Sequence, residues 1–218
     1  MRQLFLCTRL ATLLSLIFVL TPIVSDAALS TDDNAVSTIR LELKSSTPTE
    51  VALGFQLDEL RGQEVVAQDE RFQRFEIEDE SSIGPEGWPE LPTINRMVLI
   101  PAQSGVELRI RHLSTHIEEN VNVYPRQVPI ESVENYAVNF DRNPENLVIS
   151  DAAANYEGFW PPEVATIGRP AIMRGYRMVS VDIHPMRWNR QTRQLEVVDE
   201  IEIELDFSTD ANRVNTID

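Results

Sequence analysis

The chain has 218 residues, of which 42% are hydrophobic, and its 35 acidic and 19 basic residues give a formal net charge of −16. A surface of this sign repels nucleic-acid phosphates and anionic lipid, so we expect neither a nucleic acid nor a membrane as a partner of the mature chain. The one cysteine, Cys7, lies in a segment that we expect to be removed. Its removal excludes a disulfide scaffold, a thiol nucleophile and a cysteine-ligated metal site.

Residues 1–27 are typical of a secretory signal peptide. A basic start is followed by an apolar run at 10–24, which is shorter than a typical membrane-spanning helix. Small residues then lead to a predicted cleavage between Ala27 and Ala28. The mature chain would carry 17 basic and 34 acidic residues, a formal charge of −17. A retained N-terminal anchor is the alternative.

The first strands are predicted shortly after this segment. Residues 28–36 are polar and lack periodicity, so we expect a flexible leader there. Apolar and polar residues then alternate at 39–44 and again at 51–57, the period-2 pattern of half-buried strands. Three apolar residues within 72–77 indicate a further strand.

The middle of the chain contains both strand and loop patterns. Glycines and prolines crowd 84–92 and exclude regular structure there. Strands are predicted again at 93–101 and 105–117, and in the second the apolar residues change parity near His112, as a β-bulge would cause. Residues 124–155 are rich in Pro, Asn and Asp, and a loop of this length usually has a function or no fixed structure.

The last strands are predicted within 168–207, which reads as three strands joined by two turns. No stretch after residue 27 shows helical spacing over three turns. Repeated short strands separated by turn residues predict an all-β fold, an antiparallel β-sandwich. We place this single domain at 37–208 and expect a flexible tail at 209–218.

Short motifs occur in a particular order along the mature chain. G-W-P-E-L-P at 87–92 precedes M-V-L-I-P at 97–101, and F-W-P-P at 159–162 precedes R-G-Y-R, H-P and W-N within 174–189. This series, over roughly residues 60–207, resembles the propeptide of gingipain-type (family C25) secreted cysteine peptidases. The residues that match its motifs are Gly87, Pro89, Leu91, Pro92, Pro101, Arg174, Gly175, Tyr176, Arg177, Pro185 and Asn189.

The resemblance implies a β-sandwich prodomain in front of a secreted bacterial cysteine peptidase. Such a prodomain helps the catalytic domain fold and blocks its substrate cleft until proteolysis removes it. The implied partner is therefore a cysteine peptidase catalytic domain, in cis or in trans. Because the catalytic cysteine and histidine would belong to that domain, we expect no enzymatic activity and no cofactor here. We expect a secreted, periplasmic or extracellular location, and either a precursor fragment or a stand-alone module.

Two arginines in the irregular segment are candidates for a cleft-blocking loop. Arg126 lies between Pro125 and Pro129, which favour an extended backbone. An extended segment with one long basic side chain suits an acidic specificity pocket. Arg142 is the second candidate in the same stretch. The alternative for both residues is an ordinary surface connection.

We predict no metal site and no catalytic carboxylate pair. His112 and His116 lie four residues apart, about 13 Å along a strand, which is too far to share one ion. The acidic segment 141–152 departs from a calcium-binding loop at its sixth and twelfth positions. Four acids at 200–206 share one strand face and are expected to be solvated, whereas acid–base chemistry needs carboxyls in contrasting environments.

A secreted carbohydrate-binding or adhesin-like β-sandwich module is the second functional hypothesis. Phe159, Trp160, Tyr176 and Trp188 could stack on sugar rings if they were exposed on a flat face. In a sandwich, aromatic residues more often fill the core. The exposure of these four side chains therefore separates the two hypotheses.

Overall fold

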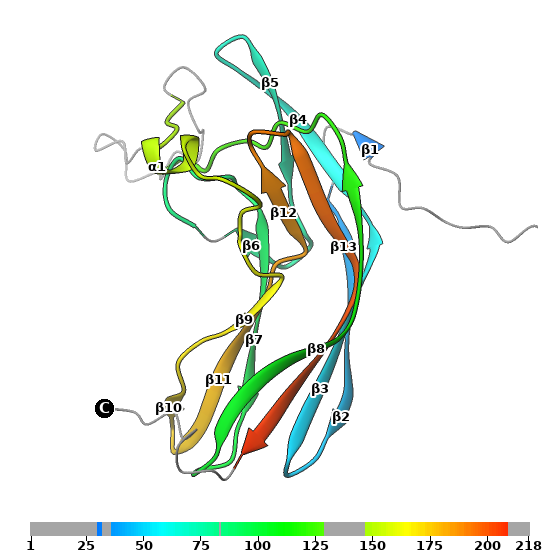
Figure 1. The fold of residues 1–218 in the computed structure, drawn as a ribbon, viewed down its shortest axis with the longest axis vertical. Coiled ribbons are helices and arrows are strands. Elements are labelled where there is room, and N and C mark those ends of the chain that lie inside the picture. Colours follow the sequence, from blue (N-terminus) through cyan, green and yellow to red (C-terminus); the bar gives the residue numbers. More distant parts are fainter. Residues whose placement is uncertain (1–29, 32–35, 83, 129–146, 209–218) are drawn as a thin grey trace, which may run out of the picture.

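The computed structural model describes residues 30–31, 36–82, 84–128 and 147–208 (Figure 1). The predicted signal peptide, with its cleavage between Ala27 and Ala28, and the predicted tail lie outside these residues. Among the helices that the structure describes, none is long and apolar enough to cross a lipid bilayer.

Nearly all regular structure in the described residues is β-strand, with one four-residue helix, α1 (Asp151–Ala154). The strands are β1 (Ser30–Thr31), β2 (Thr38–Ser46), β3 (Glu50–Glu59), β4 (Arg61–Ala67), β5 (Glu70–Phe75), β6 (Ser81–Ser82), β7 (Pro92–Leu99), β8 (Gly105–Glu118), β9 (Ala165–Ile167), β10 (Ala171–Met173), β11 (Tyr176–Ile183), β12 (Met186–Asn189) and β13 (Gln194–Ser208). The predicted all-β class is confirmed.

These strands form three sheets. The smallest has the order β1-β4-β5. The second has the order β10-β11-β7-β6, with β9 also paired with β11, and the third has the order β12-β13-β3-β2, with β8 also paired with β13. All strand pairs are antiparallel except β1 with β4. The two larger sheets form the antiparallel sandwich that the sequence predicts.

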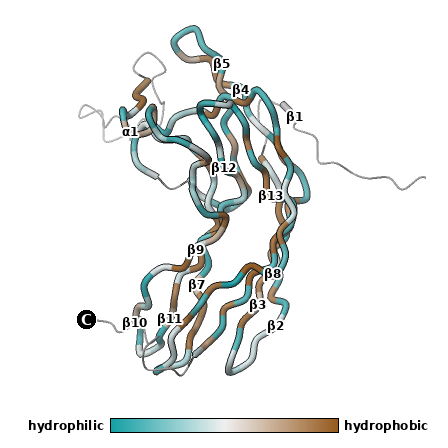
Figure 2. Tube along the Cα trace, in the orientation of Figure 1, coloured by the Kyte–Doolittle hydropathy of each residue, from teal (hydrophilic) through white to brown (hydrophobic). Residues whose placement is uncertain are grey.

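The core lies between the two larger sheets, because each of them has one apolar face. Figure 2 shows apolar and polar residues alternating along their strands. Buried core residues come from both layers: Leu53, Phe55 and Leu57 of β3, Ile94 of β7, Val179, Val181 and Ile183 of β11, and Ile201, Ile203 and Leu205 of β13. Burying each such side chain stabilises the fold by about 1.5–3 kcal/mol relative to leaving it in water.

The predicted β-bulge near His112 is confirmed. His112 pairs with Glu202 of β13, and the next pair joins Ile110 to Ile203, so Arg111 is an extra residue in β8. The bulge lets apolar residues on both sides of the parity change face the same layer.

One expectation about the strands is wrong. The block 168–207 contains four strands, and they belong to different sheets: β10 and β11 lie in one and β12 and β13 in the other. The chain crosses between the sheets at His184-Pro185, where the proline has no N–H to donate to a ladder. Within the predicted leader at 28–36, the two residues of β1 pair with β4.

His184 occupies this crossing and is largely enclosed. Its backbone N–H donates to the Val164 carbonyl at 2.9 Å, and its Nδ1 lies 3.4 Å from the Thr93 hydroxyl. Burial lowers the pKa of the imidazole below its ordinary value of 6.5, an effect that Asp182 opposes and Arg187 reinforces. The folded protein therefore favours the neutral ring.

We expect acid to destabilise the protein through His184. Below about pH 6.5 the unfolded chain takes up a proton that the folded chain binds only at lower pH, so stability falls from there down to the folded pKa. The loss of melting temperature between pH 7.5 and 5.5 should be smaller in His184→Gln than in the wild type. His112→Gln, at a half-exposed ring, is the control and should keep the wild-type loss. Equal losses in both variants would contradict this role.

Candidate functional site

One side-chain amide joins the two ends of the segment 128–147. Gln127 Nε2 donates to the Val148 carbonyl at 2.9 Å, and the Val148 N–H donates to Gln127 Oε1 at 2.8 Å. These two bonds imitate one rung of an antiparallel ladder. We call this region the loop base, defined by Gly87, Trp88, Arg126, Gln127, Val148 and Ser150.

Within the loop base, the backbone of residues 87–88 is hydrogen-bonded to the backbone of Arg126. The Arg126 N–H donates to the Trp88 carbonyl and the Gly87 N–H donates to the Arg126 carbonyl, both at 2.8 Å. Gly87 has φ +76°, and a Cβ there would lie 2.3 Å from the Ser150 nitrogen. The close approach of two backbones thus requires glycine at this position of the sequence motif.

The far end of the loop base is fixed by a helix cap and an aromatic cluster. Ser150 caps α1, because its hydroxyl accepts from the Ala153 N–H at 3.1 Å. The rings of Trp88 and Trp160 lie 4.1 Å apart, and Tyr156 meets them edge-on at 5.5 and 5.6 Å respectively. The segment that follows Val148 is therefore packed against the segment that supports Arg126.

Arg126 itself is half-buried, and its guanidinium donates to the Gly84 carbonyl. It lines a cleft of about 370 Å³ together with Arg74, Glu80 and Glu90, among others. Glu90 is 5% exposed and lies 3.3 Å from Arg74, measured between Oε2 and Nε. To enter a partner's pocket, the Arg126 side chain would have to leave Gly84.

The residues lining this cleft do not form a catalytic arrangement. They include neither histidine nor cysteine, and two of their carboxylates are paired with guanidinium groups, Glu80 with Arg96 and Glu90 with Arg74. The thiol and imidazole of a cysteine peptidase are therefore not among the side chains that line this cleft.

The other predicted arginine, Arg142, lies outside the described residues, as does the first half of the acidic segment 141–152. Within the described part, sequence reasoning did not identify Gln127, because its role depends on a residue 21 positions later in the chain. The flanking prolines that predict an extended Arg126 do agree with its ladder-like backbone bonds.

Most of the motif residues within 174–189 lie in turns or stabilise them. Arg174 and Gly175 have φ of +51° and +83°, which forms the tight turn between β10 and β11. The Arg177 guanidinium donates to the carbonyls of Pro101 and Ser104 at 2.9 and 2.5 Å. It thereby fixes the turn between β7 and β8.

The remaining motif residues are also mostly structural. Leu91 is 3% exposed, and Pro92 begins β7, next to it. The Pro185 carbonyl accepts from the Val198 N–H at 2.8 Å. Asn189 Oδ1 accepts from the backbone N–H groups of the two residues 191 and 192, which shapes the β12–β13 turn.

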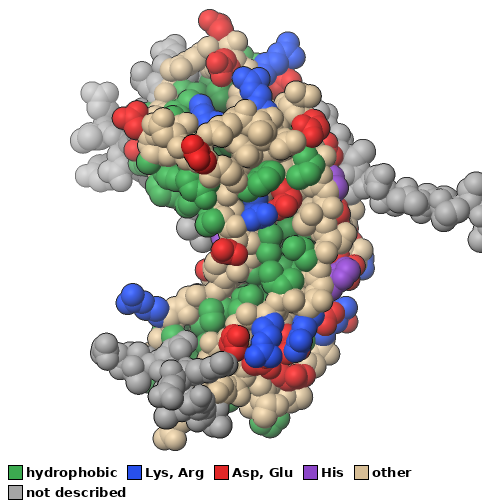
Figure 3. Space-filling view, in the orientation of Figure 1, with side chains coloured by type: hydrophobic (Ala, Val, Ile, Leu, Met, Phe, Trp, Pro, Cys, Tyr) green, Lys and Arg blue, Asp and Glu red, His purple; other side chains and the backbone are tan. Residues whose placement is uncertain are grey.

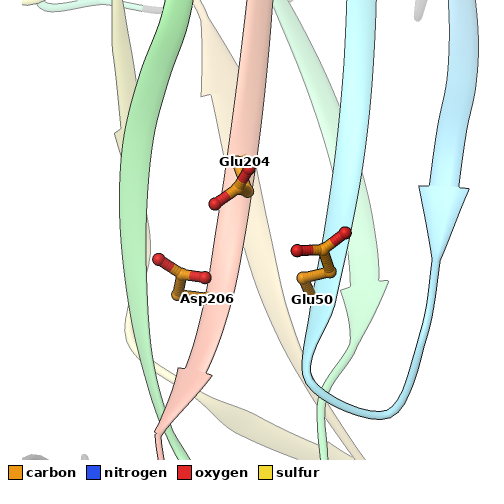
Figure 4. A group of neighbouring side chains, drawn as sticks. All are labelled: Glu50, Glu204 and Asp206. Atoms are coloured by element: carbon orange, nitrogen blue, oxygen red, sulfur yellow. The ribbon is translucent and has the colours of Figure 1, made fainter.

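Three carboxylates gather where β13 lies beside β3. Oxygens of Glu50, Glu204 and Asp206 lie within 4.8 Å of one another (Figure 4). Arg111 Nε donates to Glu204 at 2.7 Å, and Arg109 pairs with Asp206. The bond from Arg111 lowers the pKa of Glu204, so this carboxylate stays ionised. The expectation of a solvated acidic face is wrong at Glu204, whose side chain is 13% exposed.

The two histidines of β8 contact separate acids. His116 Nδ1 lies 2.7 Å from Asp199, and His112 Nε2 lies 3.8 Å from Glu200. In the part of the chain that the structure describes, no cluster of possible metal ligands includes either ring.

The aromatic residues do not form a flat exposed platform within the described residues. Trp188 is 2% exposed, and Phe159 and Trp160 are half-buried. Tyr176, in contrast, is 63% exposed. The geometry therefore gives the carbohydrate-binding hypothesis no support from stacked aromatic side chains.

Comparisons with known proteins identify a propeptide family and gingipain relatives. The family model Propeptide_C25 matches residues 35–218. Lys-gingipain of Porphyromonas gingivalis is 24% identical over 124 residues, which is 57% of this chain and 7% of the relative. Gingipain R2 of the same organism is 24% identical over 137 residues, 62% of this chain and 17% of the relative. The chain thus matches only a small part of the length of these relatives.

Solved structures show the same fold. A chain in the complex of Porphyromonas gingivalis RgpB pro- and mature domains matches with a TM-score of 0.69 and 22% identity, over 81% of this chain and 89% of that one. A structure on the zymogenic latency of gingipain K from the same organism matches with a TM-score of 0.62 and 20% identity, over 78% of this chain and 93% of that one.

Proposed function

Because the chain belongs to the C25 propeptide family, we propose that it binds the catalytic domain of a gingipain-type cysteine peptidase and keeps it inactive. It is a propeptide domain and not the catalytic domain. In this role it is secreted, assists the folding of the peptidase domain, and covers the active-site cleft until proteolysis removes it. The partner acts in cis as part of one precursor, or in trans.

The loop base is the observation that supports this role best. Gln127 and Val148 join the ends of the segment 128–147 on a frame of backbone bonds and packed aromatic rings. A loop whose ends are already fixed loses less conformational entropy on binding than a free chain does. A rigid sandwich that presents such a loop is suited to occlude a cleft.

Arg126 and Arg142 are the two residues that we propose for contact with the peptidase's specificity pocket. Arg126 stands at the loop base with its guanidinium on Gly84, and Arg142 belongs to the segment that the loop base closes. A guanidinium that enters an acidic pocket gains charge-assisted hydrogen bonds. Only one of the two needs to enter the cleft.

The test measures inhibition of purified gingipain R2 and Lys-gingipain by the mature protein, residues 28–218. We expect inhibition by the wild type, and a rise in the inhibition constant of about 100-fold when the arginine that enters the cleft is changed to alanine. Arg71→Ala, at a side chain that is 79% exposed, is the matched control and should inhibit like the wild type. If Arg126→Ala and Arg142→Ala both inhibit like the wild type, the assignment of these arginines is wrong.

A further variant separates the loop base from the arginines. Gln127→Ala removes both bonds to Val148 while leaving the buried core intact. We expect weaker inhibition at a nearly unchanged melting temperature, because the segment 128–147 then loses more conformational entropy on binding. Unchanged inhibition would show that the hydrogen bonds between Gln127 and Val148 do not contribute to inhibition of the peptidase.

A further inference from the structure

The outer face of the second sheet is apolar where β7, β10 and β11 lie side by side. On β11 the residues Val179 and Val181 point into the core, so Tyr176 and Met178 of opposite parity point outward. Met178 pairs with Leu99 of β7 on one side and with Ala171 of β10 on the other. The register thus places a row of apolar residues across three strands.

This row belongs to a larger apolar patch with high exposure. We call it the outer patch, and it consists of Met97, Leu99, Ala171, Met173, Tyr176 and Met178. Met97 is 49%, Leu99 59%, Met173 55% and Tyr176 63% exposed. Single exposed apolar residues are ordinary, but a contiguous group on one sheet face indicates an interaction surface.

Two arginines beside the outer patch have no ion-pair partner among the described residues. Arg174 lies in the β10–β11 turn and Arg169 lies just before β10, and both are exposed. Within the described residues, no carboxylate lies within 4.0 Å of either, whereas Arg109, Arg111 and Arg187 are each ion-paired. In a chain with a net charge of −16, this is a local reversal of sign that favours a partner with acidic residues.

The last strand ends close to the outer patch. Arg177 of β11 donates to the Ser104 carbonyl, and the next residue, Gly105, pairs with Ser208 at the end of β13. A peptidase domain that continues this chain beyond β13, as the proposed function in cis requires, would therefore begin near the outer patch.

The shape of the molecule allows one partner to contact both regions. The space-filling view is hollowed on one side (Figure 3). In Figure 1, α1 and the β10–β11 hairpin lie toward opposite ends of this side. The segment that leads from Val148 to α1 belongs to the loop base.

We propose that the outer patch is a docking surface for the body of the peptidase domain, separate from the loop that covers the cleft. This inference rests on the proposed function. The complementary peptidase surface is an apolar area bordered by carboxylates, which would bind Tyr176 and the methionines at its centre and Arg169 and Arg174 at its rim. Tyrosine, methionine and arginine are the residue types enriched in the contacts of protein interfaces.

The test uses gingipain R2 whose cleft has been filled by a covalent peptide inhibitor, so that the loop cannot enter. We expect the mature wild type to bind this blocked peptidase, and Leu99→Ser and Tyr176→Ser each to raise the dissociation constant by about 10- to 100-fold. Leu43→Ser and Val66→Ser, at apolar residues 60% exposed on other sheets, are the matched controls and should bind like the wild type. Melting temperatures confirm that all four variants fold.

The outcomes separate the two proposals. If the wild type does not bind the unblocked peptidase, the proposed function fails, and the docking surface fails with it. If the wild type binds the unblocked peptidase but not the blocked one, or if the outer-patch variants bind like the wild type, only the docking surface is overturned. A wild-type dimer in sedimentation that Tyr176→Ser dissociates would also overturn it, because a second copy would then cover the patch.

Discussion

Replacing Trp188 by alanine is expected to lower the free energy of unfolding by about 3–5 kcal/mol, the usual cost of deleting a buried tryptophan. The side chain is 2% exposed and belongs to the main core. Its indole N–H donates to the Val121 carbonyl at 2.9 Å, so the truncation also leaves a buried acceptor without its donor. Denaturant unfolding measures the loss, which corresponds to a fall in melting temperature of about 10 °C or more.

Trp188→Phe separates the two causes. Phenylalanine keeps most of the buried apolar area but cannot donate to Val121, so we expect a smaller loss of about 1–3 kcal/mol. A loss below about 1 kcal/mol for Trp188→Ala would show that this part of the core is not closely packed, contrary to the structure.

Replacing Gly87 by alanine is expected to lower the free energy of unfolding by about 2–4 kcal/mol, through backbone strain and a steric clash together. The residue has φ +76°, and a Cβ would lie 2.3 Å from the backbone nitrogen of Ser150, which cannot move aside as a flexible side chain could. The clash also separates the two segments of the loop base. Inhibition of the peptidase should therefore be weaker than that of the wild type even after correction for the fraction of the variant that is folded.

Gly158→Ala is the matched control for Gly87→Ala. Gly158 has φ +90°, but nothing lies within 4 Å of an added Cβ. It should therefore show the cost of the left-handed backbone alone, about 1–2 kcal/mol. Equal losses at the two glycines, measured by denaturant unfolding, would mean that the contact between Gly87 and Ser150 contributes nothing.

The strands that the sequence predicts best are those with strict alternation. Residues 51–57 lie in β3 and residues 201–207 lie in β13, as predicted. A period of two in apolar residues is a local property of the sequence and follows directly from the alternating directions of side chains on a strand. The parity change near His112 likewise predicted the extra residue Arg111, since a bulge is the local way to restore the phase.

Other features depend on contacts that alternation does not report. β4 (Arg61–Ala67) was not predicted, because it buries only the small residues Gly62 and Ala67 and so has no clear apolar face. The loop base joins Gln127 to Val148 across a long segment, and a glutamine among prolines has no distinguishing pattern.

The outer patch was missed for a related reason. Leu99 and Met97 lie in a strongly apolar stretch, which sequence reasoning assigns to a strand but not to one of its two faces. Only the register with Met178 and Ser180 of β11 shows that these two side chains lie on the outer face. Tyr176 had no predicted face, because it alternates out of step with Val179 and Val181; its exposure of 63% places it on the outer face.

The accessibility of the peptidase's catalytic cysteine tests the central claim most directly. The measurement is the rate at which iodoacetamide alkylates gingipain R2, alone and with a saturating amount of the mature protein. A prodomain that holds a loop across the cleft predicts that alkylation slows by at least about tenfold, in proportion to the fraction of peptidase bound. A complex that forms while the cysteine reacts at the rate of the free peptidase would contradict the account.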